Sequence, residues 1–138
     1  MNSALLIPVF VQVALTFVLV FTMGAMRYGA IASGKVKPGD IALGQPGWPV
    51  RIQQVSNAYE NQLASPVLFY AATAFALITG ATSVLLVVLA WAYVGLRLLH
   101  ALIHVTSNNL RSRFMAFASG LLVLLGYWVV FAVELMTR

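Results

Sequence analysis

The pattern of hydrophobic and polar positions divides the chain into four long apolar stretches separated by polar segments. The stretches cover approximately residues 3–26, 56–79, 82–106 and 114–136. Each is longer than the roughly 20 apolar residues that a helix needs to cross the hydrocarbon core of a bilayer. Strands of this length would need alternating polarity and a closed barrel, so the pattern predicts helices and almost no strand. We therefore expect an all-α fold: an integral membrane four-helix bundle in which residues 1–138 form a single domain.

The connections between the predicted helices differ in length and polarity. Residues 27–54 form the only long polar segment, and its glycines and prolines predict an irregular loop in which Trp48 anchors the chain at the membrane interface. Only Gly80 and Ala81 separate the second and third stretches, which predicts a tight antiparallel hairpin. The third connection, residues 107–113, is short and basic.

The second apolar stretch has three features that predict how it packs. Small residues recur at the spacing that lets transmembrane helices approach closely, at Ala72, Ala76 and Gly80. Pro66 removes a backbone hydrogen bond and predicts a kink, where neighbouring polar side chains can satisfy the freed carbonyl. Before the kink, the helix opens with a set of polar side chains: Gln53, Gln54, Asn57, Glu60, Asn61 and Gln62.

The composition agrees with a membrane protein and narrows the possible chemistry. Hydrophobic residues make up 62% of the chain and charged residues only 8%. The stretch that begins at Ala4 is longer than a signal-peptide core and lacks a convincing cleavage site, so we expect it to remain as an anchor. The chain contains no cysteine, which removes disulfides, cysteine metal sites and thiol nucleophiles. Any thiol chemistry would need the sulfur of a bound ligand.

The net charge of +5 reflects membrane topology rather than nucleic-acid binding. The basic residues are spaced between long apolar runs and do not cluster on one polar face. With four crossings, the first and third connections share one side of the membrane, and they carry or flank most of the basic residues: Arg27, Lys35, Lys37, Arg51, Arg111 and Arg113. The positive-inside rule predicts that these connections are cytoplasmic and that both termini lie outside.

The third apolar stretch contains a polar stripe. Arg97, His100, His104 and Asn108 follow spacings of three and four residues, so they share one face of a helix. At 1.5 Å per residue, Arg97 lies roughly 13 Å from the cytoplasmic end. A charge at such depth costs about 2.5 to 3.5 kcal/mol. The stripe must therefore face protein, water or a bound polar ligand.

An ion pair and a metal site are two alternatives to ligand binding as explanations of the stripe. Arg97 could pair with Glu60, the carboxylate in the cytoplasmic half of the second stretch, and simply pin the bundle. His100 and His104 lie one turn apart and could hold a metal ion with Glu60 as the third ligand. Two histidines fall short of the usual ligand count, so we assign no metal site. The functional explanation is that the stripe binds a polar ligand.

Together these features resemble the MAPEG family, the membrane-associated proteins in eicosanoid and glutathione metabolism, and indicate a bacterial-type member. The resemblance covers most of the chain. It is based on the four-helix plan, the long basic first loop, and the ordered residues Asn57, Glu60, Pro66, Arg97-x-x-His100 and Arg113.

The resemblance implies a homotrimer in a bacterial inner membrane that binds glutathione between adjacent subunits, near the cytoplasmic face. A lipophilic electrophile or hydroperoxide would enter from the membrane lipids and be conjugated or reduced, as in a membrane glutathione transferase. Arg113 falls at the arginine that stabilises the glutathione thiolate, and a guanidinium that is always charged suits that role. The other residues that the resemblance assigns to glutathione binding are Arg27, Asn57, Glu60, Arg97, His100 and His104.

Two positions differ from the prostaglandin-synthesising branch of the family. That branch has tyrosines where this chain has His104 and Phe117. The difference favours an alternative, a non-catalytic subunit of the same fold that binds lipid or acts as a scaffold. A third hypothesis, a small transporter or proton relay, depends on the two histidines, which titrate near neutral pH. Four helices without broken-helix signals suit a carrier poorly.

Overall fold

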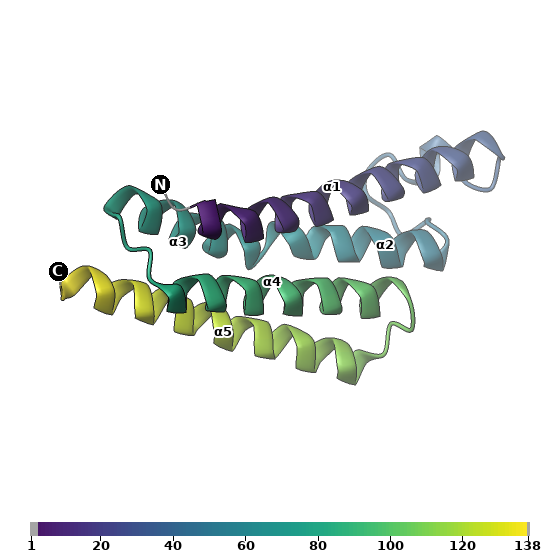
Figure 1. Cartoon of the computed structure of the whole chain (residues 1–138). Coiled ribbons are helices and arrows are strands. Elements are labelled where there is room, and N and C mark those ends of the chain that lie inside the picture. The colour runs from purple at the N-terminus through teal and green to yellow at the C-terminus, as the bar shows by residue number, and fades with distance from the viewer. Residues whose placement is uncertain (1–2, 138) are drawn as a thin grey trace.

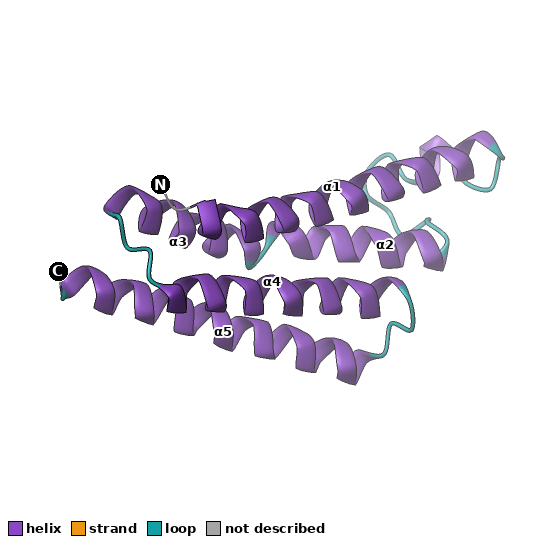
Figure 2. Cartoon of the chain, viewed as in Figure 1, coloured by secondary structure: helices purple, strands orange, loops and turns teal. Residues whose placement is uncertain are grey.

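The computed structural model describes residues 3–137, which form helices and connections without any strand. The α-helices are α1 (Ser3–Ala32), α2 (Val50–Glu60), α3 (Pro66–Thr79), α4 (Val84–Val105) and α5 (Leu110–Met136), with short 3₁₀ turns η1 (Pro38–Asp40) and η2 (Asn61–Leu63). Figure 1 shows α2 and α3 running end to end beside α1, with α4 and α5 as the other half of the bundle. Four spans are long and apolar enough to cross a membrane. The predicted four-helix bundle is therefore confirmed, and Figure 2 shows how little of the chain lies outside helices.

The first connection is shorter than the sequence suggests. α1 continues to Ala32, and Gly34, whose φ of 74° lies in the left-handed region, follows its end. α2 begins at Val50, so the prediction of an irregular loop over residues 27–54 is wrong at both ends. Apolar character locates the bilayer crossing, whereas a helix can continue into the polar region beyond it. A small apolar cluster holds these extensions together: Ala30, Val36 and Ile52.

The second span is broken, not merely kinked. α2 ends at Glu60, the turn η2 follows, and α3 begins at Pro66. The predicted continuous helix over residues 56–79 is therefore wrong, although a disturbance at Pro66 is confirmed. Proline has no backbone N–H and is favoured at the first position of a helix, so a new helix can begin there.

The hairpin of α3 and α4 is antiparallel, but the prediction that it packs tightly is wrong. α4 packs along α5, α1 and α2, whereas α3 packs mainly on α5 and α1. Large aromatic side chains fill the space between these helices. The ring of Phe69 lies 4.9 Å from that of Tyr93 and 5.9 Å from that of Tyr127, measured between centroids. Phe69 of α3 and Tyr93 of α4 therefore meet through their side chains, without close packing of the two backbones.

The small residues of α3 have two different roles. Ala72 and Ala76 are fully buried in the central apolar core, where their size permits close packing within the subunit. Gly80 is exposed and has a φ of 74°, so it ends α3 as a left-handed cap. Of the three small residues with the predicted spacing, Ala72 and Ala76 therefore serve packing, and Gly80 forms the turn.

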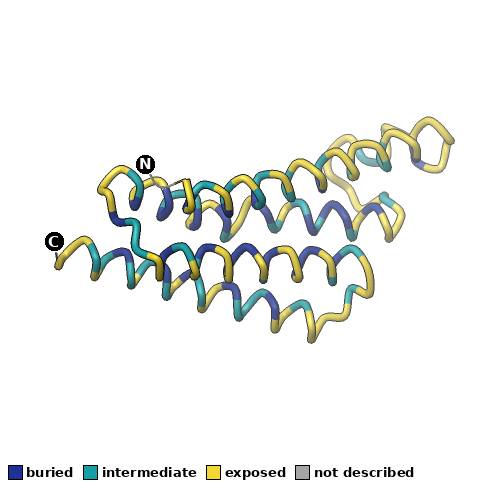
Figure 3. The backbone as a smooth tube through the Cα atoms, viewed as in Figure 1, coloured by how far each residue is buried: buried dark blue, intermediate teal, exposed yellow. Residues whose placement is uncertain are grey.

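The outer surface of the bundle is apolar. Large hydrophobic side chains remain exposed along the spans, such as Phe21 at 71% and Leu122 at 70%. Figure 3 shows buried positions where the helices face one another and exposed positions around the outside. Exposed apolar surface of this extent marks contact with lipid or with other subunits. The chain is therefore an integral, multi-pass membrane protein.

Candidate functional site

Polar side chains from neighbouring helices surround the break between α2 and α3. Gln12 of α1 is fully buried and donates from Nε2 to Oε1 of Gln62 at 2.9 Å. Gln62 in turn donates to the carbonyl oxygen of Ala58 at 2.8 Å. The hydroxyl groups of Ser65 and Tyr93 lie 2.9 Å apart. Backbone polar groups at membrane depth must find partners inside the protein, so these side chains provide the polar surroundings that a broken helix needs.

Arg97 of α4 also faces the break. Its side chain is 2% exposed, and Nη2 donates to the carbonyl oxygen of Asn61 at 2.7 Å. The ion pair between Arg97 and Glu60, one of the explanations that the sequence leaves open, does not form within residues 3–137. Glu60 is exposed at the end of α2 and accepts a hydrogen bond from the hydroxyl of Ser56 at 3.5 Å. Arg97 therefore connects α4 to the main chain of the broken span instead of to a carboxylate.

Two consecutive asparagines set the position of Arg113. Asn108 has a φ of 51°, a left-handed conformation that asparagine tolerates, and its backbone N–H bonds back to α4 at 2.8 Å. Its side-chain oxygen accepts a hydrogen bond from Nη1 of Arg113. Asn109 caps α5 by accepting a hydrogen bond of 3.0 Å from a backbone N–H of the first turn. This cap explains why α5 begins at Leu110 and not at residue 114.

The end of α4 is also held from α2. Arg51 donates from Nη1 to the carbonyl oxygen of Val105, the last residue of α4. The final carbonyl groups of a helix have no partner within it, and a cation at this end interacts favourably with the helix dipole. Arg51 therefore fixes the last turn of α4, which carries His104.

A cavity with two adjoining parts, the Arg113 cavity, lies between α2, α4 and α5. Its polar part has a volume of about 360 Å³ and is lined by Asn57, Glu60, Asn61, Ala64, His104 and Arg113. Its apolar part has a volume of about 190 Å³ and is lined by Asn61, His100, His104, Leu110, Arg113, Phe114 and Phe117. Asn61, His104 and Arg113 border both parts, so a ligand in either part meets the same guanidinium and imidazole.

The two histidines form the inner wall of the Arg113 cavity. The rings of His100 and His104 lie 5.6 Å apart in an edge-to-face arrangement, and the ring of His100 lies 5.8 Å from that of Phe117. Both histidines are buried, and the Nδ1 atom of each makes no hydrogen bond within residues 3–137. In that same part of the chain, no three side chains gather that could hold a metal ion. The imidazoles therefore remain available to a ligand in the cavity.

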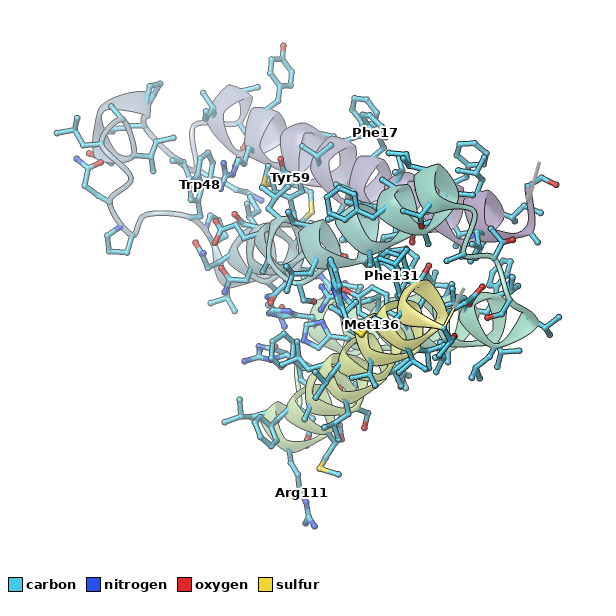
Figure 4. All side chains as sticks on the ribbon, turned by 90° about the vertical axis from the view of Figure 1, so that its left-hand side faces the viewer. Phe17, Trp48, Tyr59, Arg111, Phe131 and Met136 are labelled. Atoms are coloured by element: carbon cyan, nitrogen blue, oxygen red, sulfur yellow. The ribbon has the colours of Figure 1, made fainter. Side chains whose placement is uncertain are left out.

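A second cavity of about 500 Å³, the Arg27 cavity, adjoins the first. Nη2 of Arg27 donates to the hydroxyl of Ser56 at 2.7 Å. The guanidinium also lies 4.7 Å from the ring centre of Trp48, which is a cation–π contact. Figure 4 shows Trp48 at the loop of the first connection. Glu60 lines both cavities. The two cavities therefore meet at this carboxylate.

The structure brings most of the predicted site residues together. The Arg113 cavity is lined by Asn57, Glu60, His100, His104 and Arg113. Arg27 belongs to α1 and lines the neighbouring cavity. Arg97 does not line either cavity and faces the helix break instead. The assignment of these residues to glutathione binding stays a prediction.

Two asparagines of the site are not among the residues that the resemblance assigns to glutathione binding. Asn61 borders both parts of the Arg113 cavity, and Asn108 holds Arg113. The three-and-four spacing places Asn108 on the helix stripe, whereas the residue lies beyond the end of α4. The signal that could have located it is the Asn108–Asn109 pair in a short connection, because asparagine both tolerates a left-handed backbone and caps helices.

Comparison with known proteins gives one match. A sequence model of the MAPEG family matches residues 5–133, nearly the whole chain. No curated protein and no solved structure matches the chain. The matched range includes every residue that lines the two cavities.

Proposed function

The chain belongs to the MAPEG family. From this premise we propose that it binds glutathione or a similar small thiol and acts as a membrane transferase or peroxidase on lipophilic electrophiles or hydroperoxides. The main evidence for the proposal is the set of residues that line the Arg113 cavity. There, a guanidinium, an imidazole and a carboxylate surround a polar part that directly adjoins an apolar part. A polar thiol and a lipophilic substrate need adjoining surroundings of these two kinds in order to react.

The charges along the two cavities suit glutathione. The tripeptide carries two carboxylates and one ammonium group, and arginine forks bind carboxylates while a carboxylate binds an ammonium group. Glu60 stands between Arg27 in one cavity and Arg113 in the other. Asn57 adds an amide to the wall of the polar part. This alternation of cation, anion and cation supports binding of a zwitterionic peptide.

Two side chains would act on the sulfur. A bound thiol supplies the nucleophile that a chain without cysteine lacks. The guanidinium of Arg113, held by Asn108, favours the thiolate over the thiol because its positive charge is permanent. His104 borders both parts of the cavity. It accepts the thiol proton and then donates it to the group that leaves when the sulfur attacks, such as the alkoxide of a hydroperoxide, which is a general acid–base role suited to imidazole.

The apolar part of the cavity would receive the lipophilic substrate. Leu110, Phe114 and Phe117 form its apolar wall. Leu110 and Phe114 are exposed on the outside of the bundle, at 69% and 63%. This wall therefore continues into the apolar outer surface, so a substrate dissolved in lipid can reach Arg113 without passing through water.

A second candidate function is lipid binding without catalysis, as a scaffold or as a subunit that presents lipid to a partner protein. One observation favours it: no hydroxyl side chain lines the Arg113 cavity within residues 3–137. A fatty acid could place its carboxylate at Arg113 and its chain along Phe114 and Phe117. The two functions compete for the same arginine, so one experiment can separate them.

Assembly as a homotrimer in a bacterial inner membrane also belongs to the proposal. The family membership supports it, and so do the large hydrophobic side chains that remain exposed along the spans and leave room for contacts between subunits. Native mass spectrometry of the detergent-solubilised protein should give the mass of three chains. A stable monomer or dimer would contradict this part of the proposal.

The proposed function is tested by calorimetric titration of the purified protein with glutathione. We expect saturable binding, a thiolate absorbance in the ultraviolet, and a loss of about tenfold or more in affinity for Arg113→Ala. Arg111→Ala is the matched control, because Arg111 lies on the same helix and lines neither cavity. The thiol-dependent function is wrong if the wild-type protein shows no saturable binding. Fatty-acid binding that depends on Arg113 would then establish the second candidate.

A further inference from the structure

A groove separate from both cavities lies between α4 and α5, and we refer to it as the α4–α5 groove. Its volume is about 420 Å³. One wall comes from the apolar side chains Leu96, Leu99 and Ile103 of α4, and the other comes from Arg111, Met115 and Ser119 of α5. The groove is therefore apolar along most of its length and has a single cationic side chain.

The α4–α5 groove lies on a different face of α5 from the Arg113 cavity. Successive residues turn by about 100° around a helix, so residues two positions apart point to nearly opposite sides. Arg111 and Met115 line the groove, whereas Arg113 and Phe117 line the cavity. An inference from the groove is thus independent of the proposed thiol chemistry.

The polarity of the groove changes along its length. Arg111 stands near the connection between α4 and α5, while Leu96 and Ser119 lie towards the membrane interior. At 1.5 Å per residue, the distance from Arg111 to Ser119 along the helix is roughly 12 Å. At the inner end the helices approach each other closely, because a Cβ atom at Gly120 would lie 3.8 Å from Cβ of Leu96. The groove therefore opens at its charged end and closes at its apolar end.

The side chain of Arg111 makes no hydrogen bond or ion pair with another residue in the described range 3–137. Its side chain is exposed, and Figure 4 shows it extending away from the bundle. An unpaired arginine next to the membrane interface attracts anionic headgroups, and its hydrocarbon stem can lie along apolar surface.

We propose that the α4–α5 groove binds an anionic phospholipid. Its phosphate would lie at Arg111, and one acyl chain would run along Leu99, Ile103 and Met115. An anionic lipid fits better than a zwitterionic one, because no carboxylate of the described part of the chain lines the groove to receive an ammonium headgroup. A second copy of the chain fits less well, since it has only three acidic residues to offer to Arg111. The graded polarity of the groove matches that of a lipid, which is charged at one end and apolar along the rest.

The test is lipid binding to the detergent-solubilised full chain, measured by native mass spectrometry. Phosphatidylglycerol and phosphatidylcholine with identical acyl chains are compared. We expect the wild-type protein to retain phosphatidylglycerol preferentially, and Arg111→Ala to weaken that binding about fivefold without changing phosphatidylcholine retention. Ser119→Phe fills the inner end of the groove and should lower retention of both lipids. Lys35→Ala removes an exposed cation of the first connection and is the matched control.

Four outcomes would overturn the proposal. The first is equal retention of the two lipids, and the second is an equal effect of Arg111→Ala and Lys35→Ala. The third is displacement of phosphatidylglycerol by inorganic phosphate, which would indicate a phosphate site that does not recognise the acyl chain. The fourth is a change of subunit number in Arg111→Ala, which would assign the groove to a second copy. If Ser119→Phe fails to fold by circular dichroism, the comparison of the Arg111 and Lys35 variants still decides the question.

Discussion

Arg97 is a charged side chain that lies inside an apolar bundle, and no carboxylate among residues 3–137 pairs with it. A charge at this depth costs about 2.5 to 3.5 kcal/mol, and an intact helix offers few free carbonyl groups to compensate it. The break between α2 and α3 supplies one, because the carbonyl oxygen of Asn61 accepts a hydrogen bond from Arg97. The charge and the break therefore stabilise each other. A continuous second span would remove the turn in which Asn61 meets Arg97.

Gln12 supports the break from the opposite side, and its replacement gives a first prediction. In Gln12→Leu, Oε1 of Gln62 loses the donor that now lies 2.9 Å away. Interhelical hydrogen bonds in membranes average about 0.6 kcal/mol. We expect a loss of about 1 kcal/mol in the free energy of unfolding, because the abandoned oxygen also stays buried. The free energies of unfolding of the variant and the wild type can be compared by denaturation in mixed micelles.

The control for Gln12→Leu is Thr22→Val on the same helix. Thr22 is exposed and its hydroxyl bonds only to α1 itself, so its replacement should change the free energy of unfolding very little. Equal stabilities of the Gln12 variant, the control and the wild type would mean that the contact between α1 and the break contributes nothing to stability.

Asn108 combines a backbone role with a side-chain role, and two variants separate them. Asn108→Gly keeps the left-handed backbone and removes the oxygen that holds Arg113. Asn108→Ala removes the same oxygen and adds strain of about 1 kcal/mol or more. We expect both variants to bind glutathione more weakly, and only the alanine variant to unfold at a lower temperature. Calorimetric titration and thermal unfolding measure the two effects. Wild-type affinity in Asn108→Gly would show that Arg113 needs no support from Asn108.

The sequence predicts the four spans because a helix buried in lipid requires a long apolar run. The apolar runs locate the helix ends less well, because a helix continues past its apolar run until a capping residue ends it. Asn109 at the start of α5 is such a residue, and it lies outside the apolar run. The disturbance at Pro66 follows from the missing N–H of proline. The extent of the break depends on Gln12 and Arg97, which come from other helices. Local features were therefore predictable, and features built from several elements were not.

The same distinction applies to the candidate site. Helical spacing places His100 and His104 on one face, and both line the Arg113 cavity. Which residue of another helix meets that face depends on how far the helix is rotated, and one residue changes the direction by about 100°. A pattern within one helix contains no information about such a rotation. Nor does it show that the backbone carbonyl oxygen of Asn61 is free to accept from Arg97, because that depends on the break between α2 and α3.

The contact of α2 with the end of α4 gives a prediction at the scale of elements. Arg51→Ala removes the donor to the carbonyl oxygen of Val105 and a cation that favours this helix end. We expect the last turn of α4 to open more often, with faster amide hydrogen exchange at His104 and Val105 and unchanged exchange in the middle of α4. Lys37→Ala, an exposed cation of the first connection, is the control. Unchanged exchange in Arg51→Ala would show that the turn is held by other contacts.

At the scale of the whole molecule, the two cavities and most of the basic residues lie at the same end of the bundle. The Arg27 cavity is lined by residues of the first connection, and the Arg113 cavity is lined by Leu110, the first residue after the third connection. These two connections carry or flank most of the basic residues. The opposite connection, residues 80–83, is short and uncharged. This asymmetry means that the orientation of the chain in the membrane decides which compartment supplies the polar ligand.

Single-cysteine labelling tests this orientation directly, because the chain has no cysteine of its own to give a background signal. Ser33→Cys and Ser107→Cys mark the first and third connections, and Thr82→Cys marks the second. The positive-inside rule places the two basic connections in the cytoplasm. A membrane-impermeant maleimide should therefore label the Thr82 variant in intact cells, and the two serine variants only in inverted vesicles. The reverse pattern would place both cavities outside the cell, away from the cytosolic pool of glutathione, and would contradict the proposed thiol chemistry together with the topology.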